Sequence, residues 1–169
     1  MNAIDMVKTM MTALQSGDME LAANTMSDDF VLRGWSPAEL NKGEMLAMQS
    51  ELLSAMPDFS YHLRDLEEQD SLVTGLMRVT GTNTGDLSLP MFGIPLIQAT
   101  AVSIELPQVR TEFIVQDGKV KEMMVEAVPG GGLAGLLQQI GGELPVLPRL
   151  DNSDIRRMDK MDEANIDSR

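Results

Sequence analysis

The sequence contains no cysteine and only one histidine, His62. Without cysteine there is no disulfide, no thiolate nucleophile and no metal site built on sulfur. One histidine cannot form a two-histidine metal site, and it leaves only one Ser-His-acid arrangement in the chain. The sequence therefore lacks the side chains that most hydrolases use for catalysis. A cation site needs several converging oxygen ligands. We therefore interpret Asp28 and Asp29 as part of a solvated loop and expect no metal ion.

Basic residues are scarce: 13 Lys and Arg stand against 26 Asp and Glu, which gives a formal net charge of -13. This charge would repel the phosphates of nucleic acid and the anionic surface of a membrane. No run approaches the roughly 20 apolar residues needed to cross a bilayer, and the first residues lack the pattern of a secretion signal. We expect a cytoplasmic protein that binds neither nucleic acid nor a membrane.

Aromatic residues are also few, with four Phe, one Tyr and one Trp, whereas methionine occurs 15 times. Methionine fills irregular space and adapts to ligands of varied shape, so a methionine-rich cavity would suit a flexible apolar molecule. Methionines at helical spacing, such as Met45, Met48 and Met56, serve equally as core residues. A chain of 169 residues, 43% of them hydrophobic, is long enough for one packed domain with a short appendage.

The first third of the chain is predicted to be helical. Apolar residues at helical spacing predict a helix over residues 2–16, and Asp18 is a candidate N-cap for a short second helix. Residues 36–39 have the capping-box pattern with proline at the first helical position, which predicts a turn of helix. The apolar face of residues 43–56 predicts a third helix, which Pro57 ends because it lacks an N–H group.

Beyond Pro57 the hydrophobic period changes to two, which indicates strands. Asp117-Gly118 predicts a tight hairpin between two of them, and Pro107 predicts an interruption, for which we expect a bulge. A further turn or two of helix is expected over residues 133–140. The predicted strands cover residues 59–64, 71–84, 96–106, 109–115 and 120–128.

Helices followed by antiparallel strands predict an α+β fold, in which a curved, cone-shaped antiparallel sheet packs against N-terminal helices. We expect this single domain to span residues 1–142. Residues 143–169 carry seven acidic and five basic residues and few apolar ones after Leu150, which predicts an extended or mobile charged tail.

Six short segments of the sequence form a recognisable series: Gly17-Asp18, Ser27-Asp28-Asp29-Phe30, Met56-Pro57-Asp58-Phe59, Gly81-Thr82-Asn83-Thr84-Gly85, Asp117-Gly118-Lys119-Val120-Lys121-Glu122 and Leu136-Leu137-Gln138-Gln139-Ile140-Gly141. In their order and spacing the sequence resembles, over roughly residues 1–142, the SnoaL-like polyketide cyclases of the nuclear transport factor 2-like superfamily. The resemblance implies a cone with an apolar cavity, a homodimer, and cofactor-free acid-base chemistry such as an intramolecular aldol closure.

Two departures from the family pattern remove its usual acid-base groups. Members with cyclase activity resemble the pattern Gly-Thr-His-Thr-Gly, whose central position is Asn83 here. They also carry an aspartate four residues after a tryptophan in the last strand, and here these positions hold Val128 and Met124. Asn83 could hold a ligand oxygen or simply form a turn, but it has no proton to exchange at pH 7.

Glu126 is the candidate replacement, because strand alternation places it on one face with Met124 and Val128. If that face lines the cavity, its carboxyl would lie about 7 Å from the family's carboxylate position, and desolvation would raise its pKa. Such a glutamate could exchange a proton near neutral pH. The alternative is that Glu126 faces solvent or pairs with Arg78 or Arg110.

Three further side chains are candidate ligand contacts. Tyr61 offers an apolar ring and a hydroxyl that would orient a ligand carbonyl. Met124 is expected in the pocket, and Trp35 could close the mouth of the cone or anchor a dimer. Core packing is the alternative for Tyr61 and Trp35. His62 is expected to face away from the buried residues, as a surface or hydrogen-bonded histidine.

The leading hypothesis is a small-molecule-binding protein with cyclase or isomerase chemistry through Glu126, assisted by Asn83 and Tyr61. Its ligand would be an apolar or oxygenated small molecule, and it would need no cofactor. The alternative is a non-catalytic ligand-binding or protein-interaction module, which the missing aspartate and histidine favour. A homodimer is expected through the outer face of the sheet.

Overall fold

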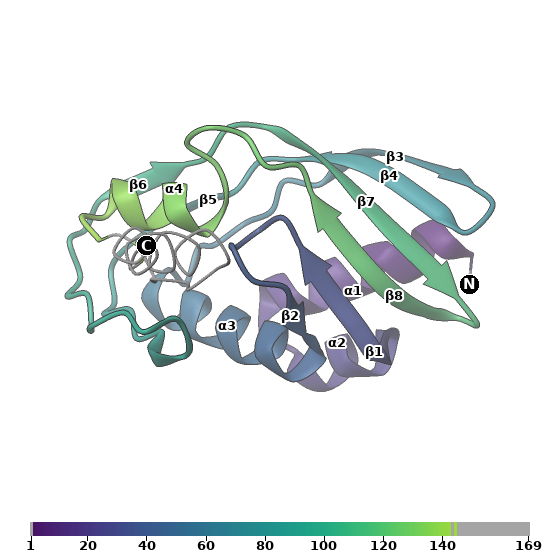
Figure 1. The fold of residues 1–169 in the computed structure, drawn as a ribbon, viewed down its shortest axis with the longest axis horizontal. Coiled ribbons are helices and arrows are strands. Elements are labelled where there is room, and N and C mark those ends of the chain that lie inside the picture. Colours follow the sequence, from purple (N-terminus) through teal and green to yellow (C-terminus); the bar gives the residue numbers. More distant parts are fainter. Residues whose placement is uncertain (1, 143, 145–169) are drawn as a thin grey trace, which may run out of the picture.

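A curved six-stranded sheet lies over three helices in the computed structural model, which describes residues 2–142 and residue 144 (Figure 1). The order in the sheet is β2-β1-β8-β7-β4-β3, and β5 and β6 form a separate pair near α4. The helices are α1 (Ala3–Ser16), α2 (Met19–Thr25), α3 (Lys42–Ala55), the short 3-10 helix η1 (Pro90–Phe92) and α4 (Gly132–Gln139). The strands are β1 (Met26–Arg33), β2 (Leu40–Asn41), β3 (Arg64–Gln69), β4 (Leu72–Met77), β5 (Thr80–Thr82), β6 (Ser103–Glu105), β7 (Val109–Gln116) and β8 (Lys119–Val125).

The predicted α+β architecture and the three leading helices are confirmed. Asp18 caps α2 as expected, with its side chain accepting a hydrogen bond from the Leu21 amide. The predicted turn of helix over residues 36–39 is wrong, because that segment forms bends before β2 pairs with β1. The capping box lies instead at Asn41 and Glu44, where it starts α3.

The hairpin at Asp117-Gly118 is confirmed, and it joins the antiparallel strands β7 and β8. The sheet is mostly antiparallel, but β8 also pairs in parallel with β1. This pairing brings the helical N-terminal third of the chain into the same sheet as the last strand, so the two ends of the domain are held together.

The predicted strands between residues 59 and 106 are longer or earlier than the observed ones. Residues 59–63 make a single bridge, Ser60 to Thr80, and β3 begins only at Arg64. The predicted strand over 71–84 is divided into β4 and β5, and β6 covers only a short part of 96–106. At Pro107 the chain passes from the small sheet to the large one, rather than forming a bulge within one strand.

Methionine and leucine dominate the core between the helices and the inner face of the sheet. Met10, Met45 and Met48 are among its largest fully buried side chains. No helix in the described part of the chain is long and apolar enough to cross a membrane. The tail predicted for residues 143–169 lies, apart from residue 144, outside the described residues.

Gly34 lies directly after β1, where the chain passes close to the end of β8. Its φ is +86°, and a Cβ atom there would lie 1.9 Å from the Val125 carbonyl oxygen. Gly118 also has a positive φ, +71°, but a Cβ atom there would meet nothing within 4 Å. Gly118→Ala should therefore cost about 1 kcal/mol of unfolding free energy, from backbone strain alone.

Gly34→Ala should cost more than about 2 kcal/mol, because strain and a backbone clash act together. Urea unfolding of both variants, followed by far-ultraviolet circular dichroism, measures the difference. Equal losses in the two variants would show that the close approach of Gly34 to β8 is not present in solution.

Candidate functional site

The space between α3 and the inner face of the sheet is where the predicted cavity would lie, and side chains fill it. The remaining void is about 10 Å³, which is about the space of one water molecule. An empty chamber is therefore absent from this part of the structure. The void is lined by Leu32, Trp35, Met45, Met48, Gln49, Leu52, Tyr61, Met77, Met123 and Val125.

Trp35 closes one side of this interior site and is 6% exposed. Its indole N–H donates to the Met48 sulfur at 3.2 Å, and its backbone carbonyl accepts from the Leu133 amide at the start of α4. Trp35 therefore lies in the wall of the interior, and not, as the sequence suggests, at the mouth of the cone or on a dimer surface.

The only polar pair in this lining is Tyr61 and Gln49. The Tyr61 hydroxyl donates to Gln49 Oε1, and Gln49 Nε2 donates to the Leu14 carbonyl at 3.2 Å. The Tyr61 ring packs edge-on against Phe59, with centroids 5.0 Å apart. The Tyr61 amide donates to Gln15 Oε1 at 2.8 Å.

Burial raises the pKa of the Tyr61 phenol well above its usual value of about 10, so the hydroxyl stays protonated at neutral pH. The buried polar side chains of the described residues are Thr25, Gln49, Asn83 and Thr111, none of which titrates near pH 7. No group of three or more His, Asp and Glu side chains in the same residues is placed to hold a metal ion. The interior can orient a ligand oxygen, but it has no group that exchanges protons at neutral pH.

Glu126 lies on the solvent side of the sheet, so the prediction that its face lines the cavity is wrong. Its carboxylate accepts a hydrogen bond from the Arg110 amide at 2.9 Å, just beyond the end of β8. Met124 shares this outer face and is 40% exposed, whereas Met123 and Val125 point inward. Met124 is therefore also not a contact of the interior site.

The reversal arises from one extra residue in β8. Val115 of β7 faces Val120, and Ile114 faces Glu122, so Lys121 has no counterpart on β7. Such a bulge shifts the alternation by one residue, and the positions that follow it change face.

Asn83 is fully buried, but its polar atoms are used within the protein. Its Nδ2 donates to the Gly85 carbonyl at 2.8 Å, and its Oδ1 accepts from the amide and the hydroxyl of Thr100. These bonds tie the loop before β6 to the end of β5. Asn83 therefore holds the loop in place and does not line the interior site.

Gln49 is the interior residue that the sequence reasoning missed. It lies one residue after Met48 and three before Leu52, on the buried face of α3. A polar residue on an otherwise apolar helix face is the signal that could have identified it, because a buried amide needs hydrogen-bond partners.

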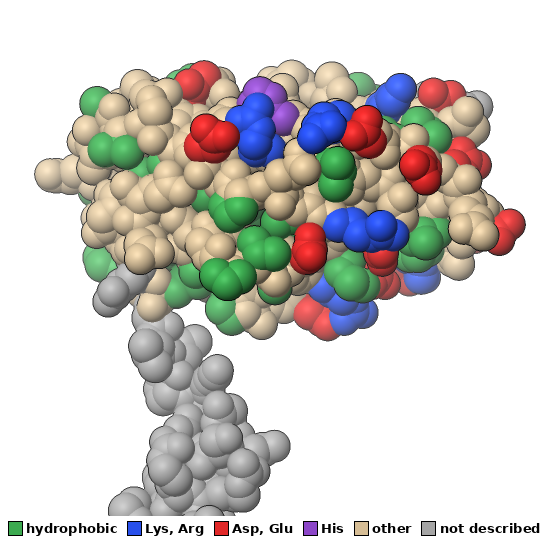
Figure 2. Space-filling view, turned by 90° about the horizontal axis from the view of Figure 1, so that it is seen from above, with side chains coloured by type: hydrophobic (Ala, Val, Ile, Leu, Met, Phe, Trp, Pro, Cys, Tyr) green, Lys and Arg blue, Asp and Glu red, His purple; other side chains and the backbone are tan. Residues whose placement is uncertain are grey.

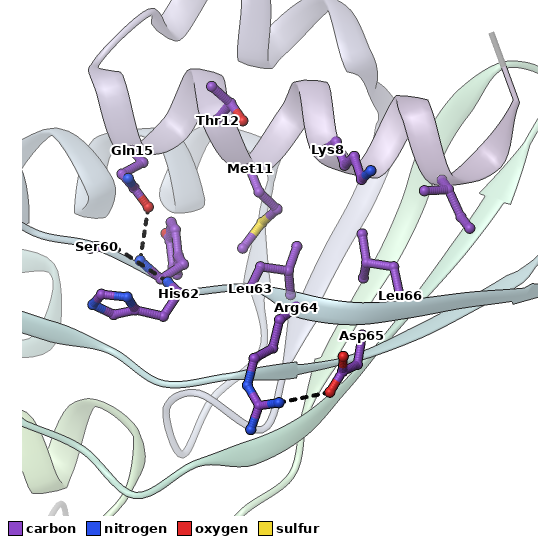
Figure 3. A pocket seen from close by; sticks show the side chains of 12 residues that line it. Lys8, Met11, Thr12, Gln15, Ser60, His62, Leu63, Arg64, Asp65 and Leu66 are labelled. Carbon is purple, nitrogen blue, oxygen red and sulfur yellow. Dashed lines mark hydrogen bonds and ion pairs between the residues drawn. The ribbon is translucent and has the colours of Figure 1, made fainter.

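A second hollow, of about 620 Å³, runs along the outside of α1 beside residues 60–66 (Figure 3). It is open to solvent and separate from the interior site, although Tyr61 borders both. The exposed side chain of His62 lies at one end, and its Nε2 is 2.8 Å from the Thr80 hydroxyl. The histidine is thus a hydrogen-bonded surface residue, as expected.

Comparison with known proteins gives one family and many similar folds. The family model of the SnoaL-like domain matches residues 7–123. No curated protein matches the chain. The solved structures described below share at most 21% identity with the chain, so their similarity supports the fold alone.

Three solved structures illustrate the similarity. IdmH from Streptomyces antibioticus, a proposed polyketide cyclase, has a TM-score of 0.61 and 21% identity, covering 80% of this chain and 99% of its own. A LEH-like epoxide hydrolase of M. tuberculosis has a TM-score of 0.59 and 16% identity, with coverages of 82% and 91%. An NTF2-like protein of unknown function from Cytophaga hutchinsonii has a TM-score of 0.52 and 11% identity, with coverages of 76% and 92%.

The Tyr61–Gln49 bond predicts an asymmetry between single and double substitutions. Tyr61→Phe leaves Gln49 Oε1 buried without a donor, and should cost about 1–3 kcal/mol of unfolding free energy. In the double variant Tyr61→Phe, Gln49→Leu, the loss should be smaller than the sum of the two single losses. Urea unfolding of the four proteins measures the coupling, and strictly additive losses would contradict the bond.

Proposed function

Because the chain belongs to the SnoaL-like domain family, we propose that it binds a small apolar molecule with one carbonyl or hydroxyl oxygen in the interior site. The observation that carries this proposal is the lining of that site, which is methionine-rich and contains one uncharged polar pair, Tyr61 and Gln49. Binding proceeds without acid-base catalysis, since no side chain in the lining of the site takes up a proton near neutral pH.

The methionines allow a ligand to enter a site that is filled in its absence. Met45, Met48, Met77 and Met123 contribute unbranched side chains that change conformation at little cost. A ligand that displaces them exchanges one apolar contact surface for another. The small remaining void is therefore compatible with binding, and the size of the ligand is set by how far these four side chains move.

One hydrogen-bonding group in the lining, and one opposite Val125 in the sheet, can bond the ligand oxygen. Gln49 Nε2 has two N–H groups, so one can donate to a ligand carbonyl while the other keeps its bond to the Leu14 carbonyl and Oε1 keeps its bond from the Tyr61 hydroxyl. The Thr111 hydroxyl is also buried on the inner side of β7 and has no hydrogen-bond partner among the described residues. A buried hydroxyl without a partner is destabilising, so a ligand that supplied one would gain from it.

Cyclase or isomerase activity, the other function consistent with the family, would need a group that takes a proton from the substrate. The interior lacks a carboxylate and a histidine over the described residues. Glu126 does not supply that group, because its side chain is exposed to solvent. Non-catalytic binding is therefore the function that the site supports best.

Trp35 gives a direct test, because it is the only tryptophan and forms part of the interior wall. Titration with acetylcyclohexane and with ethylcyclohexane, which lacks the oxygen, should change its fluorescence in a saturable way. The ketone should bind about fivefold more tightly, which corresponds to one net hydrogen bond of about 1 kcal/mol.

Gln49→Leu should remove the preference for the ketone because it removes the N–H that donates to the ligand oxygen, and Met48→Ala should strengthen binding of both probes by opening space. Met124→Ala, on the outer face, is the matched control and should change neither affinity. If neither the native protein nor Met48→Ala gives a saturable signal, the interior is closed core and the binding proposal fails.

We also propose that the protein is a homodimer through the outer face of the sheet, which supports an interaction role as the second candidate function. Figure 2 looks onto this side of the molecule and shows charged side chains of both signs among scattered hydrophobic ones. Met124 and Ala127 line a shallow hollow of about 420 Å³ there, beside the ion-paired Arg110 and Glu112. This arrangement supplies an apolar centre with complementary charges, as interfaces have.

Light scattering after size-exclusion chromatography tests the dimer at micromolar concentration. The native mass should be twice that of the chain, and Met124→Arg should reduce it to one chain because the interface would bury an unpaired charge. Leu21→Arg is the matched control, since Leu21 is 41% exposed and lies on α2, away from the sheet. A monomeric native protein would refute the proposal.

A further inference from the structure

The hollow outside α1 has the size of a ligand site, and Tyr61 is the only lining residue that it shares with the interior site. Its volume of about 620 Å³ lies within the range of small-molecule pockets. One side is formed by α1, with Lys8 and Met11, and the other by Leu63 just before β3 and Leu66 within it (Figure 3). We call this hollow the α1 groove.

The backbone at the start of β3 is shaped so that two leucines face the groove. In a regular strand, residues 63 and 66 would point to opposite faces. Asp65 has a φ of +56°, and the pairing of β3 with β4 shifts between Arg64 and Glu67. Figure 3 shows the result: Leu63 and Leu66 both point toward α1.

Space beneath these leucines is provided by Gly75 of β4. A Cβ atom at that position would lie 2.5 Å from Leu66 Cδ2 and 3.6 Å from Leu63 Cδ1. The two leucines therefore lie side by side over β4. They form an apolar floor for the α1 groove.

The charge in the groove is a single unpaired cation. Lys8 is exposed, and it is the only Lys or Arg among the described residues to which the structure gives no hydrogen bond or ion pair. The other charged groups beside the groove, Arg64 and Asp65, pair with each other at 2.8 Å and point away from α1 (Figure 3). In a chain with a net charge of -13, an unpaired lysine above an apolar floor is unusual.

We propose that the α1 groove binds an amphipathic monocarboxylate, with its carboxylate on the Lys8 ammonium and its hydrocarbon chain over Leu63 and Leu66. One cation matches one carboxylate, and the apolar floor removes the chain from water. From Lys8 the groove runs along α1 to Gln15, a distance of roughly 10 Å at the helical rise, which suits an extended chain of about ten carbons. This site is independent of the ligand proposed for the interior.

Decanoate is the probe, and decanol is its uncharged counterpart. Methyl-labelled methionine gives separate nuclear magnetic resonance signals for the two sites, because Met11 lines the groove and Met48 lines the interior. Decanoate should shift the Met11 methyl signal in a saturable way and leave that of Met48 in place. A shift at Met48 alone would place the probe in the interior and overturn the groove proposal.

Lys8→Gln should weaken decanoate binding about fivefold, the scale of one partly exposed charge pair, and should leave decanol binding unchanged. Lys119→Gln makes the same charge change at a residue that does not line the groove, since Lys119 donates to the Asn24 carbonyl, and it should have no effect. Because Lys8 is exposed, its replacement leaves the core intact. Equal decanoate affinity in Lys8→Gln and the native protein, or equal native affinities for decanoate and decanol, would refute the carboxylate site.

Discussion

The buried hydrogen bonds of Gln49 and Tyr61 connect the helical layer to the sheet layer. Gln49 on α3 bonds to the end of α1 and to the Tyr61 hydroxyl, and the Tyr61 amide bonds to Gln15 on α1. Gln49 and the Tyr61 hydroxyl are cut off from water, so loss of the bond between them leaves a costly unpaired atom. The same network fixes the wall between the interior site and the α1 groove, since Tyr61 borders both.

Chemistry in this fold depends on which face of β8 points inward. The residue without a partner on β7, Lys121, reverses the alternation, so that Met123 and Val125 line the interior. The acidic side chain of Glu126 is left in solvent as a result. The chain thus has the fold of its family, while its described residues place no carboxylate in the interior.

Much of the fold could be predicted from the sequence because its signals are local. Apolar spacing predicts α1 and α3, Asp18 predicts the start of α2, and Asp117-Gly118 predicts the hairpin. The phase of β8 could not be predicted, since Lys121 carries no local mark of a bulge and the adjacent residues Met123 and Met124 suit either face. The α1 groove was missed because the left-handed backbone at Asp65 lies at a shift in the pairing of β3 with β4, which the alternation of residues 59–64 does not indicate.

We propose that the interior site binds its ligand through uncharged groups only. The pH dependence of interior binding tests this most directly, with the dissociation constant of acetylcyclohexane measured from pH 6 to pH 8.5. Because the pKa of Tyr61 is raised by burial and no other interior side chain titrates in this range, the constant should not change. A tenfold change with a midpoint inside this range would reveal a titrating group in contact with the ligand, and would contradict the account.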